Sequence, residues 1–221
     1  MYGLTLPITK HNFLVHSAAE LCETVPLAFE IAESGRPGPV AIDVPKDVQS
    51  ETIDIDKWPE PGRRRSAAPC PEEKIAALAH LFAHSRRPLL YLGGGVISAG
   101  AENLAGRLAH RAGAPVVCTL MALGVLPPED PLMMGMLGMH GTQGTNLLME
   151  EADLVVAIGS RFDDRATGKV SEFCPRATIA HIDIDAAEIG KIKSAFLGLP
   201  GDAAEILSRL LDLLPQQERA G

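Results

Sequence analysis

One run of residues organises this chain: Leu154-Val155-Val156-Ala157-Ile158-Gly159-Ser160-Arg161-Phe162-Asp163-Asp164-Arg165. Its first five residues are apolar and predict a buried strand. Gly159 and Ser160 stand where that strand ends, and small residues at that point let a ligand approach the backbone closely. Two arginines and two aspartates follow at once. Because open α/β sheets bind ligands beyond the carboxyl ends of their strands, we expect a site for an anionic ligand that carries hydroxyl groups, such as a nucleotide.

This strand lies inside a region, residues 71–215, in which helices and strands alternate. Periodic apolar residues predict helices at 72–84, 101–112, 145–151 and 203–214, and strands at 88–92, 116–120, 154–158 and 178–184. We also expect a loop rich in Gly and Met at 121–141, a short helix near 188–191 and an extended piece at 195–199. Such alternation is typical of an α/β fold, a doubly wound and mainly parallel sheet with helices on both faces.

The residues before this region do not form a domain by themselves. Residues 1–47 hold one predicted helix, 18–33, and one predicted strand, 40–44. We expect an orphan helix–strand segment that needs a sheet from elsewhere and is the least stable part of the chain. Residues 48–70 are polar and rich in proline, which predicts a linker, and Arg63-Arg64-Arg65 is interpreted as a solvated part of it. Residues 216–221 are expected to be a tail.

Composition restricts the partners and the compartment. Of the 221 residues, 46% are hydrophobic and 22% are charged, as in soluble globular proteins. The net charge of −8 argues against nucleic acid or an anionic membrane surface as a partner. The four cysteines lack metal-ligand spacing, no apolar run reaches the roughly 18 residues of a membrane span, and no signal peptide is recognisable. We therefore expect a cytoplasmic chain with reduced thiols and no metal site.

Loops that follow parallel strands emerge at one edge of a sheet, so four candidate loops should cluster. They contain Gly93-Gly94-Gly95; Thr119-Leu120 with Leu137-Gly138-Met139-His140; Gly159-Ser160-Arg161 with Asp163 and Arg165; and Asp183-Ile184, to which Gly201-Asp202 adds another glycine and acceptor. Glycines permit close backbone contact, and Met and Leu form an adaptable apolar surface on which a flat ring can lie. An acidic residue at a strand end commonly accepts hydrogen bonds from ribose.

Each feature also has a simpler explanation that the sequence leaves open. In these explanations the glycine run, residues 93–95, is a plain turn, and His140 makes structural hydrogen bonds. The loop of residues 161–165, here called the Arg/Asp loop, is a surface ion-pair network, and Asp202 only caps a helix. The absence of G-x-G-x-x-G counts against an ordinary NAD site. No nucleophile elbow or general acid–base pair is recognisable either, so we predict a binding site without a catalytic residue.

At these loops the chain resembles the large, catalytic subunit of acetolactate synthase (acetohydroxyacid synthase), an enzyme of thiamine diphosphate and FAD. The matching segments follow the order of that family and cover nearly the whole chain: Ile8-Thr9-Lys10-His11-Asn12, Ser34-Gly35-Arg36-Pro37-Gly38-Pro39-Val40, Tyr91-Leu92-Gly93-Gly94-Gly95, Gly135-Met136-Leu137-Gly138-Met139-His140-Gly141, Arg161-Phe162-Asp163-Asp164-Arg165 and His181-Ile182-Asp183-Ile184-Asp185. The Arg-Phe-Asp-Asp-Arg and Gly-Met-His-Gly segments distinguish this family from FAD-free acetolactate synthases.

The resemblance implies that residues 71–215 are a central FAD-binding domain and that residues 1–47 are the end of a preceding pyrimidine-binding domain. It implies FAD contacts at Arg36, Gly93, Gly94, Gly95, Thr119, Leu120, Leu137, Gly138, Met139, His140, Gly159, Arg161, Asp163, Arg165, Asp183, Ile184 and Asp202. The small residues at strand ends add Ser160 and Gly201 to this set. Arg165 also corresponds to an arginine near the substrate channel of the family, and Lys10 to a lysine at the mouth of that channel.

Members of this family condense two pyruvates, or pyruvate and 2-oxobutanoate, with loss of CO2, in branched-chain amino-acid synthesis. Their activating glutamate and their Gly-Asp-Gly motif for Mg2+ and thiamine diphosphate have no counterpart in this sequence, so we expect the chain alone to be inactive. The resemblance implies a homo-oligomer and allows a regulatory subunit. It also implies that FAD has no net redox role in the condensation reaction. Two other interpretations stay open: a non-catalytic module for ADP, NAD or CoA, and a scaffold with an empty site.

Overall fold

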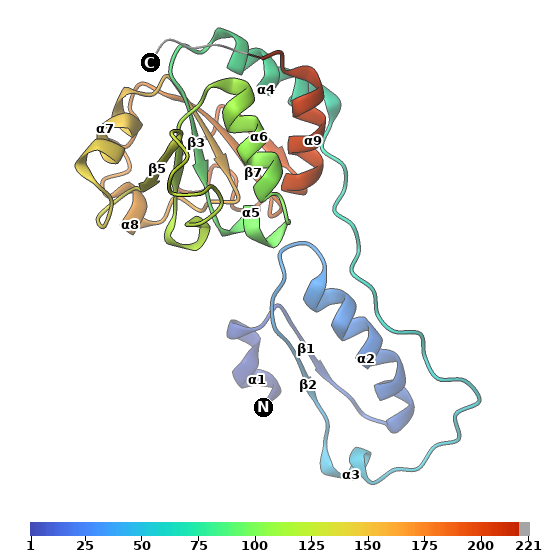
Figure 1. Cartoon of the computed structure of the whole chain (residues 1–221). Coiled ribbons are helices and arrows are strands. Elements are labelled where there is room, and N and C mark those ends of the chain that lie inside the picture. Colours follow the sequence, from blue (N-terminus) through green and yellow to red (C-terminus); the bar gives the residue numbers. More distant parts are fainter. Residues whose placement is uncertain (217–221) are drawn as a thin grey trace. The chain divides into compact units, whose positions relative to one another are not determined.

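The computed structural model describes residues 1–216 and separates into two compact units (Figure 1). The first unit is Met1–Ala67, and the second begins at Ala68. The boundary falls inside the segment 48–70 that the sequence predicts as a linker. The assignment of the units to domains of a larger enzyme stays a prediction, and residues 217–221 of the expected tail lie outside the described residues.

The second unit is built on a six-stranded sheet in which every neighbouring pair of strands is parallel. Its strands are β3 (Pro88–Leu92), β4 (Val116–Cys118), β5 (Met133–Met136), β6 (Leu154–Ile158), β7 (Thr178–Asp183) and β8 (Leu197–Pro200). Their order across the sheet is β5-β4-β3-β6-β7-β8. All residues of β3 and β6 are buried, which explains why both appear in the sequence as unbroken apolar runs. This sheet confirms the predicted α/β fold class.

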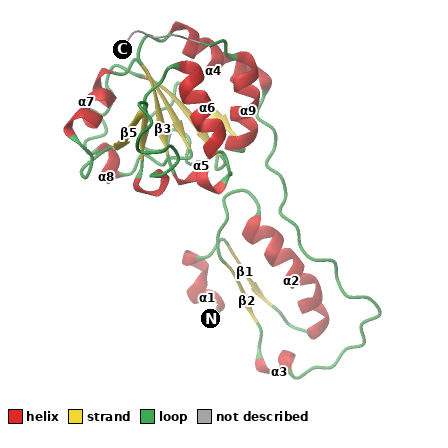
Figure 2. Ribbon diagram, in the orientation of Figure 1, coloured by secondary structure: helices red, strands yellow, loops and turns green. Residues whose placement is uncertain are grey.

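Helices cover both faces of the sheet (Figure 1, Figure 2). They are α4 (Glu72–His84), α5 (Gly94–Ser98), α6 (Glu102–Ala112), α7 (Gln143–Glu151), α8 (Asp164–Thr167) and α9 (Ala203–Leu213). Leu90 and Leu92 of β3 join the core that α4, α6 and α9 share. Leu89 and Tyr91 of the same strand join a second core with Met149 of α7. Alternate residues of one strand therefore serve the two faces, as the pleat requires.

The structure corrects several sequence-based element bounds. The expected loop at 121–141 contains β5, whose residues Met133-Met134-Gly135-Met136 show neither alternation nor β-branched side chains, and Gly135 has a φ of +86°. The expected helix near 188–191 is a series of turns. The predicted strand at 116–120 already ends at Cys118, because a 3-10 helix, η2 (Leu120–Ala122), follows it.

The first unit is a βαβ arrangement. β1 (His11–Leu14) pairs in parallel with β2 (Val40–Asp43), and α2 (Ala18–Glu33) connects the two strands. Short helical segments flank them: α1 (Tyr2–Thr5), η1 (Leu6–Ile8) and α3 (Lys46–Gln49). The expectation of a single strand was wrong, because β1 contains His and Asn and so does not form an apolar run. A two-stranded sheet is marginally stable by itself.

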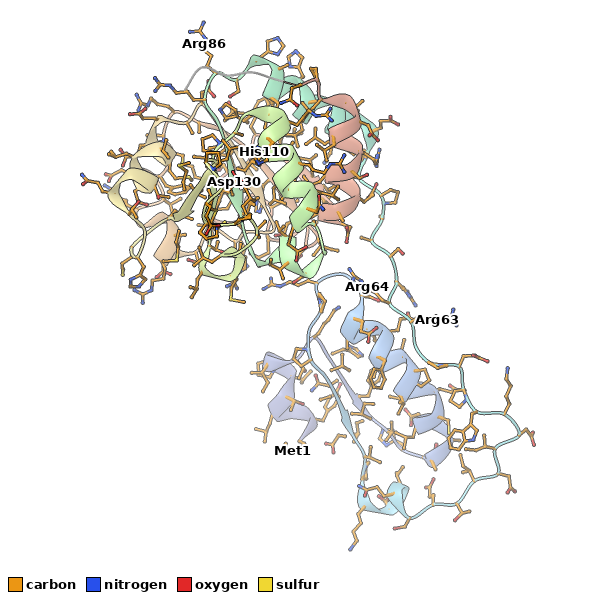
Figure 3. All side chains as sticks on the ribbon, in the orientation of Figure 1. Met1, Arg63, Arg64, Arg86, His110 and Asp130 are labelled. Atoms are coloured by element: carbon orange, nitrogen blue, oxygen red, sulfur yellow. The ribbon has the colours of Figure 1, made fainter. Side chains whose placement is uncertain are left out.

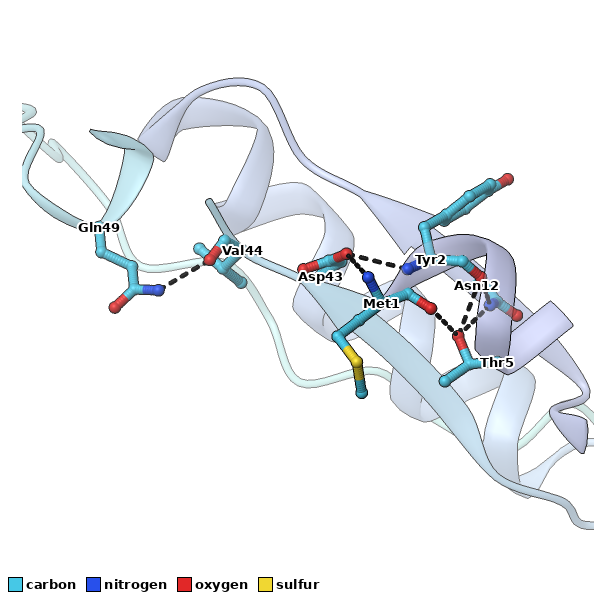
Figure 4. Close-up of polar contacts among 7 residues, drawn as sticks. All are labelled: Met1, Tyr2, Thr5, Asn12, Asp43, Val44 and Gln49. Carbon is cyan, nitrogen blue, oxygen red and sulfur yellow. Dashed lines mark hydrogen bonds and ion pairs between the residues drawn. The ribbon is translucent and has the colours of Figure 1, made fainter. Parts of the chain in front are cut away.

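Polar contacts tie the first residues of the chain to these strands (Figure 4). The Asn12 side-chain amide donates to the Tyr2 carbonyl at 2.9 Å. The Asp43 carboxylate accepts from the Tyr2 amide at 3.0 Å and lies 3.4 Å from the amine of Met1. Asn12 is buried, so the Tyr2 carbonyl satisfies an amide that would otherwise lose its hydrogen bonds to water.

Residues 51–71 contain neither helix nor strand, yet part of this stretch is fastened to α2. A Cβ on Gly62 would lie 1.8 Å from the carbonyl oxygen of Pro26, so the position admits only glycine. The Arg65 amide donates to Ser34 Oγ at 2.8 Å, and the Arg65 guanidinium pairs with Glu30. The segment around residue 62 to 65 therefore belongs structurally to the first unit.

Candidate functional site

The candidate site lies along the edge of the sheet where the strands end. Since all six strands are parallel, the segments that follow them emerge at this one edge. From β3 the chain runs outward through β4 and β5, then crosses back to β6 and runs outward through β7 and β8. The direction in which successive strands are added to the sheet therefore reverses between β3 and β6, which makes this position the topological switch point. Ligands of doubly wound sheets bind at such a switch point. The loops that begin at Gly93 and Gly159, after β3 and β6, flank it.

The two loops at the switch point pack directly against each other. Gly93 N donates to the Ile158 carbonyl at 2.9 Å, and Gly95 N donates to the Gly159 carbonyl at 3.1 Å. A Cβ on Gly93 would lie 2.1 Å from the carbonyl oxygen of Gly159, and one on Gly94 would lie 3.1 Å from Cβ of Met121. The glycine run is therefore more than a plain turn, because its missing side chains make room for neighbouring protein.

The loop after β5 joins the Arg/Asp loop by a similar contact. A Cβ on Gly138 would lie 2.2 Å from the Arg165 carbonyl oxygen, and the Met139 amide donates to that oxygen at 2.9 Å. Asn146 clamps Gly138 from the other side: its Oδ1 accepts from the Gly138 amide at 2.8 Å, and its Nδ2 donates to the Gly138 carbonyl at 3.1 Å. The sequence analysis assigned no role to Asn146.

The Arg/Asp loop presents two guanidinium groups. Arg161 and Arg165 are exposed, and within residues 1–216 neither side chain forms an ion pair; the nearest polar contact is Arg165 Nη1 at 3.9 Å from Met139 Sδ. The Asp163 carboxylate accepts from the Ala166 amide at 3.2 Å and caps α8. The alternative of a surface ion-pair network therefore finds no support in the described part of the chain. Paired guanidinium groups suit a phosphate ligand.

The acidic candidates have defined structural roles. Asp183 is buried, and its Oδ1 accepts from the Asp185 amide at 2.9 Å. Asp202 caps α9 by accepting from the amides of Ala204 at 2.9 Å and Glu205 at 3.2 Å. Helix capping is thus one established role of Asp202, as the simpler explanation held. Gly201 has a φ of +151°, and its amide donates to the Asp183 carbonyl at 3.0 Å.

Buried polar atoms at the same edge lack partners within residues 1–216. Thr119 follows β4 and Ser160 follows the Gly159 turn after β6, and the hydroxyl oxygens of both are buried without a hydrogen bond. A buried hydroxyl without a partner costs about 1–3 kcal/mol, so such atoms are uncommon in folded proteins. Their position beside the switch point fits a site that receives a further hydrogen-bonding group.

Apolar side chains add a surface to this edge. Leu120 is 70% exposed and Met139 is 64% exposed, and Met121 and Ile97 are exposed as well. The Leu137 side chain packs in the second core, so only its backbone is placed to meet a ligand, and its contact with FAD stays a prediction. His140 is exposed, and among the described residues its ring makes no hydrogen bond, so a structural role for it is not supported. Ile184 is half-buried directly after β7.

Two predicted residues, Arg36 and Lys10, belong to the first unit, so the edge of the six-stranded sheet is built without them. Arg36 is exposed and follows the end of α2. The Lys10 ammonium donates to the Ile31 carbonyl at 2.6 Å and to the Ser34 carbonyl, at the carboxyl end of α2. In this structure Lys10 therefore closes the last turn of a helix, where a positive charge is favourable.

A residue that the sequence analysis quoted without a role, His181, lies under the Arg/Asp loop. It is 0% exposed, and its Nε2 lies 2.9 Å from the Ser160 carbonyl oxygen. Its ring also contacts Phe162, whose φ of 55° is rare for a residue other than glycine. Burial lowers the pKa of His181 below its usual value. Only tertiary contacts reveal this arrangement.

A separate cavity of about 440 Å³ lies along α6, away from the switch point. His110 Nε2 and Asp130 Oδ2 lie 2.8 Å apart in its wall, and Figure 3 labels both residues. The Leu132 amide, and then His110, lower the pKa of Asp130. Within residues 1–216, no cluster of three or more His, Cys, Asp or Glu side chains is placed to hold a metal ion.

Comparison with known families decides what this edge belongs to. A family model described as "Thiamine pyrophosphate enzyme, central domain" matches residues 75–210, more than half of the chain. The chain belongs to the thiamine pyrophosphate enzyme family. The matched residues include all six strands of the sheet and the candidate site, apart from Arg36 and Lys10.

Several relatives within this thiamine pyrophosphate enzyme family are similar over almost the whole chain. Acetolactate synthase isozyme 1 large subunit of Escherichia coli is 49% identical over 99% of this chain and 39% of its own length. The acetolactate synthase large subunit of Corynebacterium glutamicum is 47% identical over 95% of this chain and 34% of its own length. A probable acetolactate synthase large subunit of Methanocaldococcus jannaschii is 48% identical over 96% of this chain and 37% of its own length.

These relatives confirm the resemblance to acetolactate synthase large subunits. The chain nevertheless spans only 34% to 39% of their length. Among the described residues, no helix combines the length and the apolar character needed to cross a membrane.

Proposed function

We propose that this chain is the FAD-binding middle portion of an acetolactate synthase large subunit. The observation that carries the proposal is the pair of exposed guanidinium groups, Arg161 and Arg165, beside the switch point of a doubly wound sheet. Neither has an ion-pair partner within residues 1–216, and the unpartnered Thr119 and Ser160 hydroxyls lie at the same edge. The resemblance, supported by relatives that are 47–49% identical, supplies FAD as the specific ligand.

In this proposal different residues of the edge bind different parts of the cofactor. The Arg161 and Arg165 guanidinium groups neutralise the pyrophosphate. The exposed side chains of Leu120, Met121 and Met139 offer the apolar surface for the flavin ring. Backbone groups of the glycine loops and the acceptors Asp183 and Asp202 serve the ribose and adenine end. FAD then acts as a structural element of the site, without a net redox change.

The proposed activity of the whole protein is the condensation of two pyruvates, or of pyruvate and 2-oxobutanoate, with loss of CO2. Thiamine diphosphate would supply the electron sink for decarboxylation. The activating glutamate and the Gly-Asp-Gly motif of the family have no counterpart in this sequence, so we assign thiamine diphosphate and Mg2+ to other parts of the protein. The chain by itself is expected to form no acetolactate. We also propose a cytoplasmic homo-oligomer, with residues 1–47 as the end of the pyrimidine-binding domain and a regulatory subunit as a further partner.

Equilibrium binding tests this proposal. The purified 221-residue chain is titrated with FAD while the flavin absorption bands and the melting temperature are followed. We expect a perturbed flavin spectrum and a raised melting temperature. The absence of both at millimolar FAD would remove the case for a flavin site in this chain.

The main competing function is a module for ADP, NAD or CoA. The exposed apolar side chains at 120, 121 and 139 favour a flavin ring over a ligand that offers only an adenosine half. Competition decides between them: ADP or NAD should displace FAD only weakly. Displacement of FAD by equimolar ADP would favour the adenosine module, and no binding of any nucleotide would favour an empty scaffold.

A further inference from the structure

The hydrogen bond between His181 and Ser160 requires a proton on Nε2 of the imidazole. A carbonyl oxygen can only accept, so the Nε2 atom at 2.9 Å from the Ser160 oxygen must carry the proton. The other ring nitrogen, Nδ1, is buried and has no hydrogen-bond partner within residues 1–216. Of the two neutral tautomers of the imidazole, the geometry therefore specifies the one with its proton on Nε2.

The surroundings keep this imidazole neutral. A second proton would place an N–H group on Nδ1, where the described residues offer no acceptor. Burial lowers the pKa of His181, although the Asp183 carboxylate, with Oδ2 at 4.0 Å from Nε2, acts in the opposite direction. Since the ring stays uncharged, it works as a hydrogen-bond donor and as a packing surface.

The carbonyl that His181 holds stands at the start of the Arg/Asp loop. Ser160 precedes Arg161, and the next residue, Phe162, adopts a positive φ that only surrounding contacts can maintain. The Phe162 ring meets the His181 ring edge-to-face, with centroids 5.1 Å apart, and the Tyr91 and Phe173 rings at 5.4 and 6.1 Å. One histidine thus fixes the backbone before Arg161 and the side chain after it.

We propose that His181 is a positioning residue for the flavin site. Its Nε2–H group holds the Ser160 carbonyl and its ring seats Phe162, so that Arg161 and Arg165 are presented to the FAD pyrophosphate. His181 lies beneath the loop and does not touch the cofactor in this arrangement. The inference rests on the proposed function only for the identity of the ligand, because the support given to the loop is a property of the protein alone.

A matched pair of substitutions separates the hydrogen bond from simple packing. Gln and Met have similar length and volume, but only Gln places an N–H donor near the position of Nε2. We expect His181→Gln to keep the FAD affinity of the parent chain within about twofold, and His181→Met to weaken it by about tenfold or more. Equal affinity of the two variants would overturn the proposal.

A second measurement needs no FAD. Amide exchange of the unliganded chain should show protection at Ala166 and Thr167, whose amides donate to the Asp163 carbonyl, and at Met139, whose amide donates to Arg165. We expect His181→Gln to preserve this protection and His181→Met to lose it selectively, while the amides of β3 stay protected in both. Equal protection of the loop in the two variants would contradict the positioning role.

Nitrogen-15 NMR of the imidazole completes the test, because a residue that merely fills space has no required tautomer. We expect the Nε2–H tautomer at neutral pH. An Nδ1–H tautomer or an imidazolium would refute the inference. If the parent chain fails to bind FAD but its loop behaves as described, the proposed function fails while the support by His181 stands.

Discussion

Gly95 and Gly159 lie back to back, since a Cβ added to Gly159 would come within 2.5 Å of Cα of Gly95. The two residues belong to loops that are separated by more than sixty positions in the sequence and meet at the switch point of the sheet. This contact fixes the spacing between the ends of β3 and β6. Any ligand that binds there meets a backbone surface whose shape is set by the contact between these two loops.

The first prediction follows from this contact. Gly95→Ala should lower the free energy of unfolding by about 1–3 kcal/mol, because a methyl group has no room against Gly159. Gly144→Ala in α7 is the matched control, since its Cβ would approach nothing closer than 3.9 Å and alanine favours a helix by roughly 0.5–1 kcal/mol. Urea unfolding of both variants measures the effect, and equal stabilities would show that the close packing is absent in solution.

The second prediction concerns the guanidinium groups. Arg161→Met should weaken FAD binding by about tenfold to a hundredfold, because a charge-assisted hydrogen bond is lost. Its melting temperature without FAD should match that of the parent chain, since Arg161 has no ion pair among the described residues. Calorimetric titration at low and high salt gives the affinities.

Arg86→Met serves as the control for this experiment. Arg86 precedes β3, at the opposite edge of the sheet from the Arg/Asp loop, and Figure 3 labels it. Its removal should leave FAD affinity unchanged. A similar loss of affinity in both variants would mean that the chain responds to net charge and not to a built pyrophosphate site.

The third prediction tests the clamp on Gly138. Asn146→Ala removes one acceptor and one donor at 2.8 and 3.1 Å from the Gly138 backbone, and should cost about 1–3 kcal/mol of stability. Asn146→Asp keeps the acceptor for the Gly138 amide, so its stability should lie between that of the parent chain and that of Asn146→Ala. FAD affinity is expected to follow the same order. Binding that is unaffected by Asn146→Ala would separate this loop from the site.

The fourth prediction concerns acid stability at the other edge of the sheet. Burial raises the pKa of Asp153, but hydrogen bonds from the Ser85 hydroxyl and the amides of Arg86 and Arg87 outweigh burial and lower it. The folded state therefore binds the proton less readily than the unfolded state, whose value is about 3.9. The stabilisation is complete above about pH 4 and is lost as pH falls through the lowered value.

Asp153→Asn should accordingly destabilise the chain at neutral pH, and the difference from the parent should shrink as the solution is acidified. Urea unfolding across the acidic range measures this. Glu151→Gln is the control, because its exposed pair with Arg87 contributes only about 0–1 kcal/mol. A difference between parent and Asp153→Asn that does not change with pH would contradict the assignment.

The central strands and the larger helices were accessible from sequence because their signals are local. β3 and β6 are unbroken apolar runs, each followed by a glycine, and α4 carries a clear helical period over Glu72–His84. From these elements the parallel sheet followed, and with it the meeting of the loops at one edge. Edge elements gave weaker signals, since two of the four residues of β1, His11 and Asn12, have polar side chains and β5 is interrupted by Gly135.

The roles of single residues were harder to predict, because they depend on distant partners. The glycine run was expected to admit a ligand, but the room that it leaves is shared with Gly159 and Met121. No local sequence pattern indicates that His181 contacts Ser160 or that Asn146 contacts Gly138. Residue type at the strand ends therefore indicated a candidate site, while tertiary contacts determine which groups of that candidate site remain available to a ligand.

The contact of Lys10 with the end of α2 has a consequence for chemical labelling. An ammonium held by the Ile31 and Ser34 carbonyls must release both before it can attack an acylating reagent. Lys10 should therefore be modified more slowly than a lysine such as Lys57, whose exposed side chain pairs with Glu60 among the described residues. Once acylated, Lys10 can no longer cap the helix through its charge, and the last turn would fray. The rate of its modification would thus report how often Lys10 leaves the carboxyl end of α2.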